Sequence, residues 1–350
     1  MLGIDTRAAR YTWTAALTVL LLCLFYLIRT TLFVFVLALL FAYLLSPLVN
    51  VIDRFLPGKG TRTLALTIAY VLFIAALFAA VTQIGSRVIE QANTLAKSMP
   101  ALLQKLQQPV PGNSLRAELI ARIQEQVARS SSDVFALLPR AGSRIIALAS
   151  NLIYVVIIPI LGFFFLKDGG EIRRHFLELI DDESQRVRVD DLLADIDLLL
   201  ARYMRAILLL SVATFTAYSI FFSILHVPFS ILLAALAGSL EFIPMIGPVT
   251  AGALILIVTL VNGGPFVGAL VFLCVYRVFQ DYILAPQLMR TGMKLHPLLI
   301  LFGVFAGAEL SGVPGAFLSV PVLALIRIVY RRLRSRRIAM VIPEVPAAET

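Results

Sequence analysis

Charged residues are scarce in this chain of 350 residues: they make up 15% of it, whereas hydrophobic residues make up 60%. Soluble domains carry roughly a quarter charged residues, so this composition excludes an ordinary soluble domain. Uncharged apolar stretches of about 20 residues, the length that crosses a bilayer core, recur along the chain. They include residues 64–81, 145–166 and 206–225. The composition therefore predicts a multi-pass protein that has the lipid bilayer as its solvent.

Cysteine is rare as well, and the sequence motifs of common catalytic sites are missing. Cys23 and Cys274 each lie in an apolar run with no His or acidic residue at ligand spacing, which indicates packing. No segment has the phosphate-binding pattern Gly-x-x-x-x-Gly-Lys-Ser/Thr, and neither Gly-x-Ser-x-Gly nor His-Glu-x-x-His occurs. These absences argue against an enzyme, a bound cofactor and a resident metal.

The net charge of +9 does not indicate a nucleic-acid partner, because the basic residues form no basic domain with interleaved aromatic residues. They collect at the ends of apolar runs instead. Five arginines within residues 331–337 follow directly on the last run. By the positive-inside rule this cluster predicts a cytoplasmic C-terminus.

These patterns predict an all-α polytopic transmembrane bundle of about eight hydrophobic segments in the bacterial inner membrane, with both termini cytoplasmic. The predicted parts are residues 1–85 as N-terminal transmembrane helices, 86–144 as an extracytoplasmic amphipathic helical hairpin, 145–166 as a transmembrane helix, 167–205 as a cytoplasmic helical segment, 206–330 as a repeated transmembrane unit and 331–350 as a basic cytoplasmic tail.

The first two apolar runs, 13–28 and 32–45, are separated by three residues that include neither Gly nor Pro. A tight hairpin of two helices and one long tilted helix both fit this spacing. Arg7 and Arg10 favour the hairpin, because two spans keep the N-terminus on the same side as the basic residues of 54–62.

In the predicted cytoplasmic segment, the acidic residues 181–183 stand where anions suit a helix N-terminus. Further acids lie mostly off the apolar stripe of the helix that follows, which predicts a solvated face, with a cation site as the alternative. These acids are Asp190, Asp191, Asp195 and Asp197.

Two apolar stretches in the last third, 227–260 and 295–326, are interrupted at their centres by Pro and Gly beside a carboxylate. Proline and glycine break a helix, and irregular backbone at membrane depth is tolerated only where protein or water covers it. The residues at the interruptions are Glu241, Pro244 and Gly247 in the first stretch and Glu309, Gly312 and Gly315 in the second.

Each interrupted stretch follows an ordinary span, so residues 206–260 and 266–330 have the pattern of a duplicated unit. Matching interrupted segments in two repeats are the best sequence indication of a transport site. Two membrane-crossing stretches would make the repeats parallel, and two re-entrant hairpins would make them inverted. Arg290 and Lys294 favour re-entrant hairpins, because that topology places their linker in the cytoplasm.

At these residues the chain resembles the autoinducer-2 exporter family of bacterial permeases, over residues 12–332. The segments that carry the resemblance are SPLV at 46–49, FFFLKDG at 163–169, EFIPMIGP at 241–248, QDY at 280–282, LHPL at 295–298 and GVPG at 312–315. Asp281 stands where the family often has Glu. The resemblance implies a homo-oligomeric permease, such as a pentameric ring, without nucleotide-driven chemistry. Members are associated with export of the quorum-sensing signal and, in other branches, with sodium or proton exchange.

The sequence thus predicts an ion-coupled secondary permease that exports a small solute, such as a quorum-sensing signal or a similar organic molecule. The alternatives are a sodium (lithium)/proton antiporter and a non-transporting membrane scaffold. Charges inside a bilayer are costly and are rarely kept without a role. Glu241 and Glu309 are therefore the candidate proton or sodium sites, with buried structural carboxylates as the alternative. Arg277 and Asp281, four residues apart beside Gln280, form either a self-neutralising pair or part of the coupling machinery.

Overall fold

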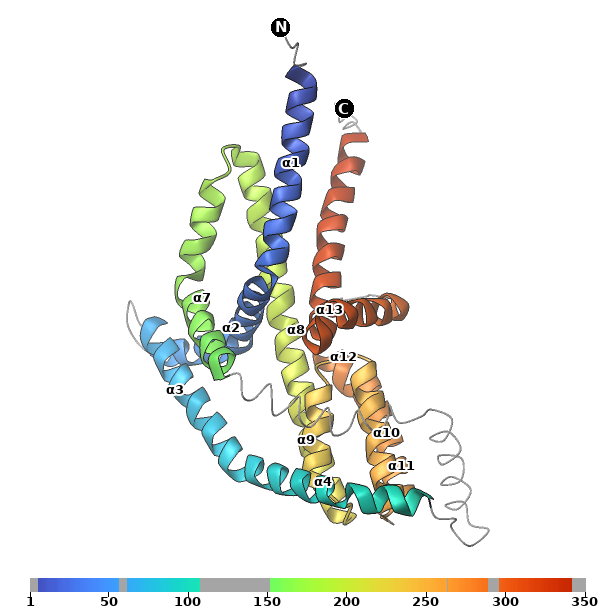
Figure 1. Ribbon diagram of the computed structural model, residues 1–350. Coiled ribbons are helices and arrows are strands. Elements are labelled where there is room, and N and C mark those ends of the chain that lie inside the picture. The colour runs from blue at the N-terminus through green and yellow to red at the C-terminus, as the bar shows by residue number, and fades with distance from the viewer. Residues whose placement is uncertain (1–5, 57–61, 108–151, 263, 289–295, 342–350) are drawn as a thin grey trace, which may run out of the picture.

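A computed structural model describes residues 6–56, 62–107, 152–262, 264–288 and 296–341, and every regular element in these ranges is a helix (Figure 1). Within the described residues, six helical stretches are long and apolar enough to cross a membrane, and two shorter apolar helices accompany them. The six are Arg10–Leu27, Arg29–Phe55, Arg62–Ser98, Glu183–Ile224, Phe266–Leu288 and Pro297–Arg332, and the two shorter ones are Ser230–Leu240 and Ile246–Val261. The predicted all-α polytopic bundle is confirmed.

Helices α1 (Thr6–Leu27) and α2 (Arg29–Phe55) meet at Ile28 without turning back on each other. The amide of Ile28 donates to the Leu24 carbonyl at 3.0 Å, and the amide of Leu32 donates to the Ile28 carbonyl at 2.9 Å. Helical hydrogen bonding therefore continues across the joint. The favoured tight hairpin is wrong, because the two helices continue into each other through a bend at the joint.

The third helix, α3 (Arg62–Ala80), continues through the π-helical turn η1 (Val81–Gly85) into α4 (Ser86–Gln107). Helix α4 is the first half of the predicted amphipathic hairpin, and the second half lies outside the described residues. Figure 1 shows α4 running across one end of the bundle, beside α9. There the Gln91 side-chain oxygen accepts a hydrogen bond of 2.9 Å from the Leu232 amide.

Two long helices, α7 (Leu152–Glu178) and α8 (Glu183–Ile224), form an antiparallel pair that projects from the other end of the bundle (Figure 1). Asp182 caps α8 by accepting hydrogen bonds from the amides of Ser184 and Gln185, as the acidic residues there predict. The predicted cytoplasmic segment and the following span are not separate elements, because α8 runs through both as one helix of 42 residues.

The first interrupted stretch folds as a helical hairpin, which we call hairpin 1, made of α9 (Ser230–Leu240) and α10 (Ile246–Val261) packed against each other. At 1.5 Å per residue these helices are only about 17 and 24 Å long, so neither reaches across a hydrocarbon core of about 30 Å. Hairpin 1 packs against α8 and α11, and a common apolar core joins the three. This geometry favours the re-entrant alternative.

The second unit begins with α11 (Phe266–Phe279), the π-helical turn η2 (Gln280–Leu284) and the short α12 (Ala285–Leu288). Helix α13 (Pro297–Val341) follows, and its backbone is not helical at Ser311 and Gly312. A Cβ atom on Gly307 would lie 2.3 Å from the Gly315 carbonyl oxygen, so the two arms fold back on each other with almost no space between them. We call residues 297–332 hairpin 2.

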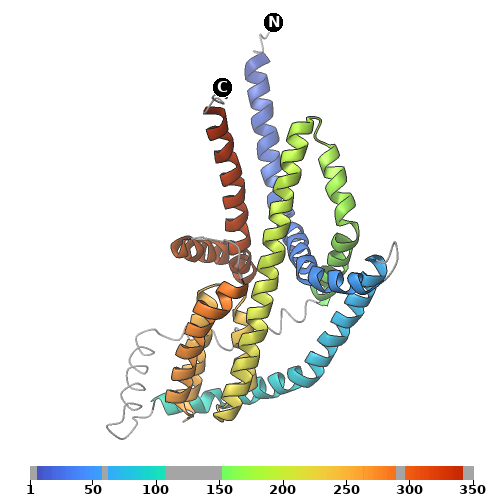
Figure 2. The same ribbon diagram turned by 180° about the vertical axis from the view of Figure 1, so that it is seen from behind.

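The sequence pattern of a span followed by an interrupted segment is therefore matched twice by a helix followed by a hairpin. The start of α1, the α7–α8 turn and the end of α13 lie at one end of the molecule, and α4 lies at the opposite end (Figures 1 and 2). This arrangement agrees with the predicted topology. The side of the membrane that each end faces and the inverted relation between the two units stay predictions.

Candidate functional site

Hairpin 1 turns at residues 241–245, and Glu241, the first residue of the turn, is the C-cap of α9. Pro244 has no amide hydrogen to continue a helix, and Met245 has a φ of 65°, in the left-handed region. A Cβ atom on Gly247 would lie 1.8 Å from the Leu240 carbonyl oxygen, so only glycine lets the two arms meet here. Pro244 and Gly247 thus shape the tip, and Glu241 stands at it.

The Glu241 side chain points into the protein, where the residue is 8% exposed. Thr214 of α8 donates a hydrogen bond to its Oε1 atom at 3.2 Å, and Gln280 of η2 donates one to its Oε2 atom at 2.8 Å. The Thr214 hydroxyl also lies 3.1 Å from the Tyr276 hydroxyl of α11. We call these four residues the tip site, and both hydrogen-bonding partners of its carboxylate among the described residues are neutral.

Gln280 reaches the carboxylate from the first position of the π-helical turn η2. The amide of Ala285 donates to the Gln280 carbonyl, five residues earlier, which is the wide turn of a π-helix. Single π-helical turns inside α-helices occur frequently at functional sites. The widening occurs at the residue that contacts Glu241, so the backbone irregularities of hairpin 1 and of η2 meet at one carboxylate.

Arg277 and Asp281 form an ion pair with each other, with 2.8 Å between Arg277 Nε and Asp281 Oδ2. Their side chains are 42% and 45% exposed, unlike the buried residues of the tip site. The pair is thus self-neutralising, one of the two arrangements that the spacing predicts. A part in coupling stays a prediction.

The two glutamates that the sequence places side by side as candidates differ in their surroundings. Both stand at a break in the backbone, but Glu309 is exposed whereas Glu241 is buried. The break itself falls at Gly312, whose φ of 65° suits glycine, and Gly315 provides the close contact between the arms. The predicted likeness of the two segments therefore holds for the backbone and not for the carboxylates.

Sequence reasoning missed Thr214 and Tyr276. Thr214 sits in an ordinary apolar span, where a lone threonine usually bonds its own helix and gives no signal. Tyr276 precedes Gln280 by four residues, so the two share a helix face, and this spacing was the available sign that Tyr276 belongs with Gln280. The contact with Thr214 could not be found this way, because 62 residues separate it from Tyr276.

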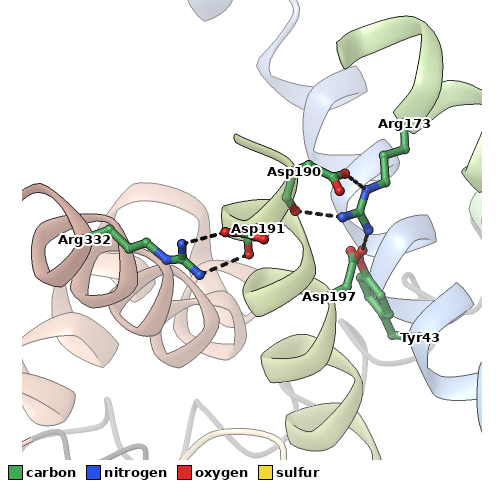
Figure 3. A network of polar contacts seen from close by, with 6 residues as sticks. All are labelled: Tyr43, Arg173, Asp190, Asp191, Asp197 and Arg332. Carbon is green, nitrogen blue, oxygen red and sulfur yellow. Dashed lines mark hydrogen bonds and ion pairs between the residues drawn. The ribbon is translucent and has the colours of Figure 1, made fainter. Parts of the chain in front are cut away.

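A second polar cluster joins α7, α2 and α13 to the acidic residues of α8 (Figure 3). Arg173 donates to the Asp190 side chain at 2.6 Å, to the Asp190 carbonyl at 2.7 Å and to Asp197 at 3.2 Å. The Tyr43 hydroxyl donates to Asp197 as well. We call this cluster, with the Arg332 contacts below, the Arg–Asp network.

The other two aspartates of this face, Asp191 and Asp195, bind Arg332 of α13. Arg332 Nε donates to Asp195 at 3.0 Å, and its Nη2 atom donates to the Asp191 carbonyl at 3.3 Å. Arginines from two other helices pair with these acids, whose side chains are still 40–61% exposed, so the face is solvated as predicted and carries ion pairs that were not predicted. In the part of the chain that the structure describes, no three His, Cys, Asp or Glu side chains gather as a metal site.

Comparison with known proteins gives a consistent result along nearly the whole chain. The family model described as "AI-2E family transporter" matches residues 16–335. "Putative transport protein YrrI" of Bacillus subtilis is 25% identical over 316 residues, which cover 87% of each chain. "AI-2 transport protein TqsA" of Escherichia coli is 24% identical over 305 residues, which cover 84% of this chain and 83% of that one. With its tip site and two helical hairpins, the chain belongs to the AI-2E family of transporters.

Proposed function

We propose that this transporter is a secondary permease that exports a small organic solute across the bacterial inner membrane, and that Glu241 couples the movement to an ion. The observation that carries the proposal is a buried carboxylate at the tip of a short hairpin, held by neutral donors from two other helices. Such a carboxylate can bind a cation without first displacing an arginine or a lysine that is hydrogen-bonded to it.

The position of Glu241 at the tip of hairpin 1 is suited to transport by alternating access. Secondary transporters commonly place their ion sites at discontinuous helices near the middle of the bilayer. Glu241 touches α8 through Thr214 and α11–η2 through Gln280, so a change in its charge alters contacts between three elements at once. Loading and release of an ion can therefore be linked to movement of hairpin 1 against the other two.

The solute belongs to the same proposal. TqsA is named as a transporter of AI-2, and the family takes its name from the same activity. Autoinducer-2 is accordingly the first solute to test here, within a panel of small polar organic molecules. Sodium and lithium gradients without solute test the antiporter alternative.

The decisive experiment measures gradient-driven uptake into proteoliposomes for the wild type and for Glu241→Gln, at two pH values. Glutamine keeps the shape of the side chain, and Gln280 can turn its amide to present an oxygen instead of a nitrogen, so the fold has no reason to change. We expect at least a tenfold loss of coupled uptake, roughly the effect of 1.4 kcal/mol, with thermal stability close to wild type.

Uptake by Glu241→Gln that equals the wild type and keeps its pH dependence would overturn the coupling role and leave Glu241 as a structural carboxylate. Glu309→Gln is the matched variant, because it makes the same change in the other hairpin. We expect a milder loss there, since Glu309 is exposed. No flux of any solute or ion with the wild type would instead favour a scaffold.

Orientation and assembly complete the proposal. We place both termini and the α7–α8 turn in the cytoplasm. A cysteine introduced at Asp191 tests this orientation, because it should react with an impermeant reagent only after the cells are permeabilised.

We also propose a homo-oligomer, because the Arg277–Asp281 pair lies about half exposed on an apolar helix, where lipid contact is costly. Native mass spectrometry of the protein in nanodiscs checks the assembly, and a monomer would contradict it.

A further inference from the structure

The tip site is a continuous row of hydrogen-bonding groups, from Gln280 through Glu241 and Thr214 to Tyr276. Thr214 is 1% exposed, Gln280 is 4% exposed and Tyr276 is 6% exposed, so water does not reach most of the row. A buried polar group must find its partner inside the protein. The hydrogens of these four side chains are therefore tied to one another.

With Glu241 ionised, the row has one consistent arrangement. A carboxylate only accepts hydrogen bonds, so the Thr214 hydroxyl must donate to Oε1 and the Gln280 amide to Oε2. The Thr214 oxygen is then free to accept, and the Tyr276 hydroxyl donates to it. Every donor in the row points towards the negative charge.

With Glu241 protonated, the arrangement reverses without any movement of heavy atoms. The proton forms an O–H bond at Oε1 and neutralises the carboxylate, and that O–H group can donate to the Thr214 oxygen. Thr214 then turns its own hydrogen towards the Tyr276 oxygen. Hydroxyl groups can make this change because each is both a donor and an acceptor and rotates freely.

We propose that Thr214 and Tyr276 form a reversible hydroxyl relay that sets the pH at which Glu241 takes up a proton, so that the coupled ion is the proton. The inference rests on the coupling role proposed for Glu241. Both carboxylate oxygens already accept hydrogens, from a hydroxyl and from an amide nitrogen. A proton keeps both contacts once the Thr214 hydroxyl reverses, whereas a sodium ion would require the Thr214 hydrogen to turn away and the Gln280 amide to present its oxygen.

Other ionisable groups near the carboxylate come from α8 and from α11–η2. They are Tyr218 on α8, Tyr276 and Arg277 on α11, and Asp281 on η2. Helices α9 and α10 of hairpin 1 contain no ionisable side chain. Arg277 and Asp281 act on Glu241 with opposite signs and are paired with each other. The pH response can therefore be tested at the relay with that pair left in place.

The experiment follows the proton itself, so no solute has to be known. Protonated carboxyl groups have their own infrared carbonyl band, and the band of Glu241 is identified as the one that Glu241→Gln removes. Titration of this band in the full-length protein in proteoliposomes gives the pH of half-protonation. The titration is repeated in sodium chloride and in choline chloride.

Thr214→Val should move the midpoint upward by about one to two pH units, because the ionised form loses a hydrogen bond to a charged group and the neutral form loses a weaker one. Tyr276→Phe should move it in the same direction by a smaller amount, since it removes only the cooperative support of Thr214. Thr214→Ser restores the hydroxyl and should restore the midpoint.

Thr259→Val is the matched control. Thr259 is also fully buried, but its hydroxyl bonds the Ile255 carbonyl of its own helix, so the midpoint should stay at the wild-type value. An unchanged midpoint in both Tyr276→Phe and Thr214→Val would overturn the relay, and a midpoint lowered by sodium would overturn the proton as coupled ion. Either result leaves the proposed function standing, whereas wild-type uptake by Glu241→Gln would remove that function itself.

Discussion

Glu241 and Asp197 each accept a hydrogen bond from a hydroxyl group, Thr214 for the first and Tyr43 for the second, and they differ in what else surrounds them. Glu241 is buried, and its other hydrogen-bonding partner is a neutral amide. Asp197 is 46% exposed and contacts Arg173. The same chemical group is thus placed once in a buried site beside neutral donors and once in a partly exposed site beside a cation.

Helix α8 carries both arrangements, with the acids of the Arg–Asp network near its start and Thr214 about five turns beyond the last of them. The network ties α8 to α2, α7 and α13, whereas the tip site ties it to hairpin 1 and η2. A continuous helix transmits displacement along its length. The difference between the two clusters therefore separates a region that ties α8 to three other helices from the region for which we propose a response to an ion.

The largest effect is expected from a methyl group at the tip of hairpin 1. Gly247→Ala would place Cβ 1.8 Å from the Leu240 carbonyl oxygen, so the arms would have to separate. We expect a loss of about 3 kcal/mol or more in the free energy of unfolding, seen as a low yield and a lowered thermal midpoint in detergent.

Gly252→Ala is the control for this change. Gly252 lies in the same helix as Gly247, but its new methyl group would have no neighbouring atom within 4 Å. Alanine is the better helix former by about 1 kcal/mol, so this variant should be as stable as the wild type or more stable. Equal stability of the two variants would show that the close approach at the tip is not needed, and the tip site would lose its structural basis.

An intermediate effect is expected from Arg173→Ala in the network. The change leaves Asp190 and Asp197 without their cation, on side chains that are partly exposed, so we expect a loss of about 1–2 kcal/mol. High salt should narrow the difference from the wild type, because it screens exposed charges. Thermal midpoints at low and high salt measure both effects.

Arg174→Ala provides the matched comparison one residue along α7. Among the residues that the structure describes, Arg174 pairs with Glu171 and Glu178 of its own helix and is well exposed, so its loss should cost less than about 0.5 kcal/mol. Indistinguishable midpoints for the two variants would mean that the network does not fix α8, and the contrast with the tip site would rest on burial alone.

Local sequence signals account for the parts of this structure that could be predicted. The apolar runs predict the spans, Pro244 and Gly247 predict the break in hairpin 1, and Gly312 predicts the break in hairpin 2. Each of these features depends on residues that are close together in the chain. The predicted tight hairpin between the first two helices was wrong because it relied on charges far from the joint. The local sequence at the joint contains neither Gly nor Pro to make a turn.

The rest depended on contacts between distant residues. Thr214 and Glu241 are 27 residues apart, and Arg332 and Asp195 are 137 residues apart. Composition cannot show such pairs, and a row of acids on one helix face has the same pattern whether water or arginine covers it. The difference in burial between Glu241 and Glu309 is likewise set by the neighbouring helices and not by the two motifs, which are similar.

The smallest effect concerns Asp182, at the turn that holds Arg173 opposite Asp190. Hydrogen bonds from the Ser184 side chain and from the amides of Ser184 and Gln185 lower the pKa of Asp182. A carboxyl group with a lowered pKa in the folded protein stabilises it above its ordinary pKa of about 3.9 and loses that contribution as the pH falls further. Acid should thus loosen the start of α8, whereas we propose that the tip site accommodates a protonated carboxyl group.

Amide hydrogen exchange at Ser184 and Gln185 measures this effect, as protection factors at neutral pH and at about pH 3. Protection should fall in acid for the wild type, be low at both pH values for Asp182→Ala, and be independent of pH for Asp182→Asn, which keeps an acceptor without a titrating group. Asp181→Asn should behave as the wild type, because Asp182 is the residue that caps the helix. Wild-type protection that does not change on acidification would contradict a stabilising role for the Asp182 charge. Acid would then loosen neither the start of α8 nor the tip site, and the contrast between them would be lost.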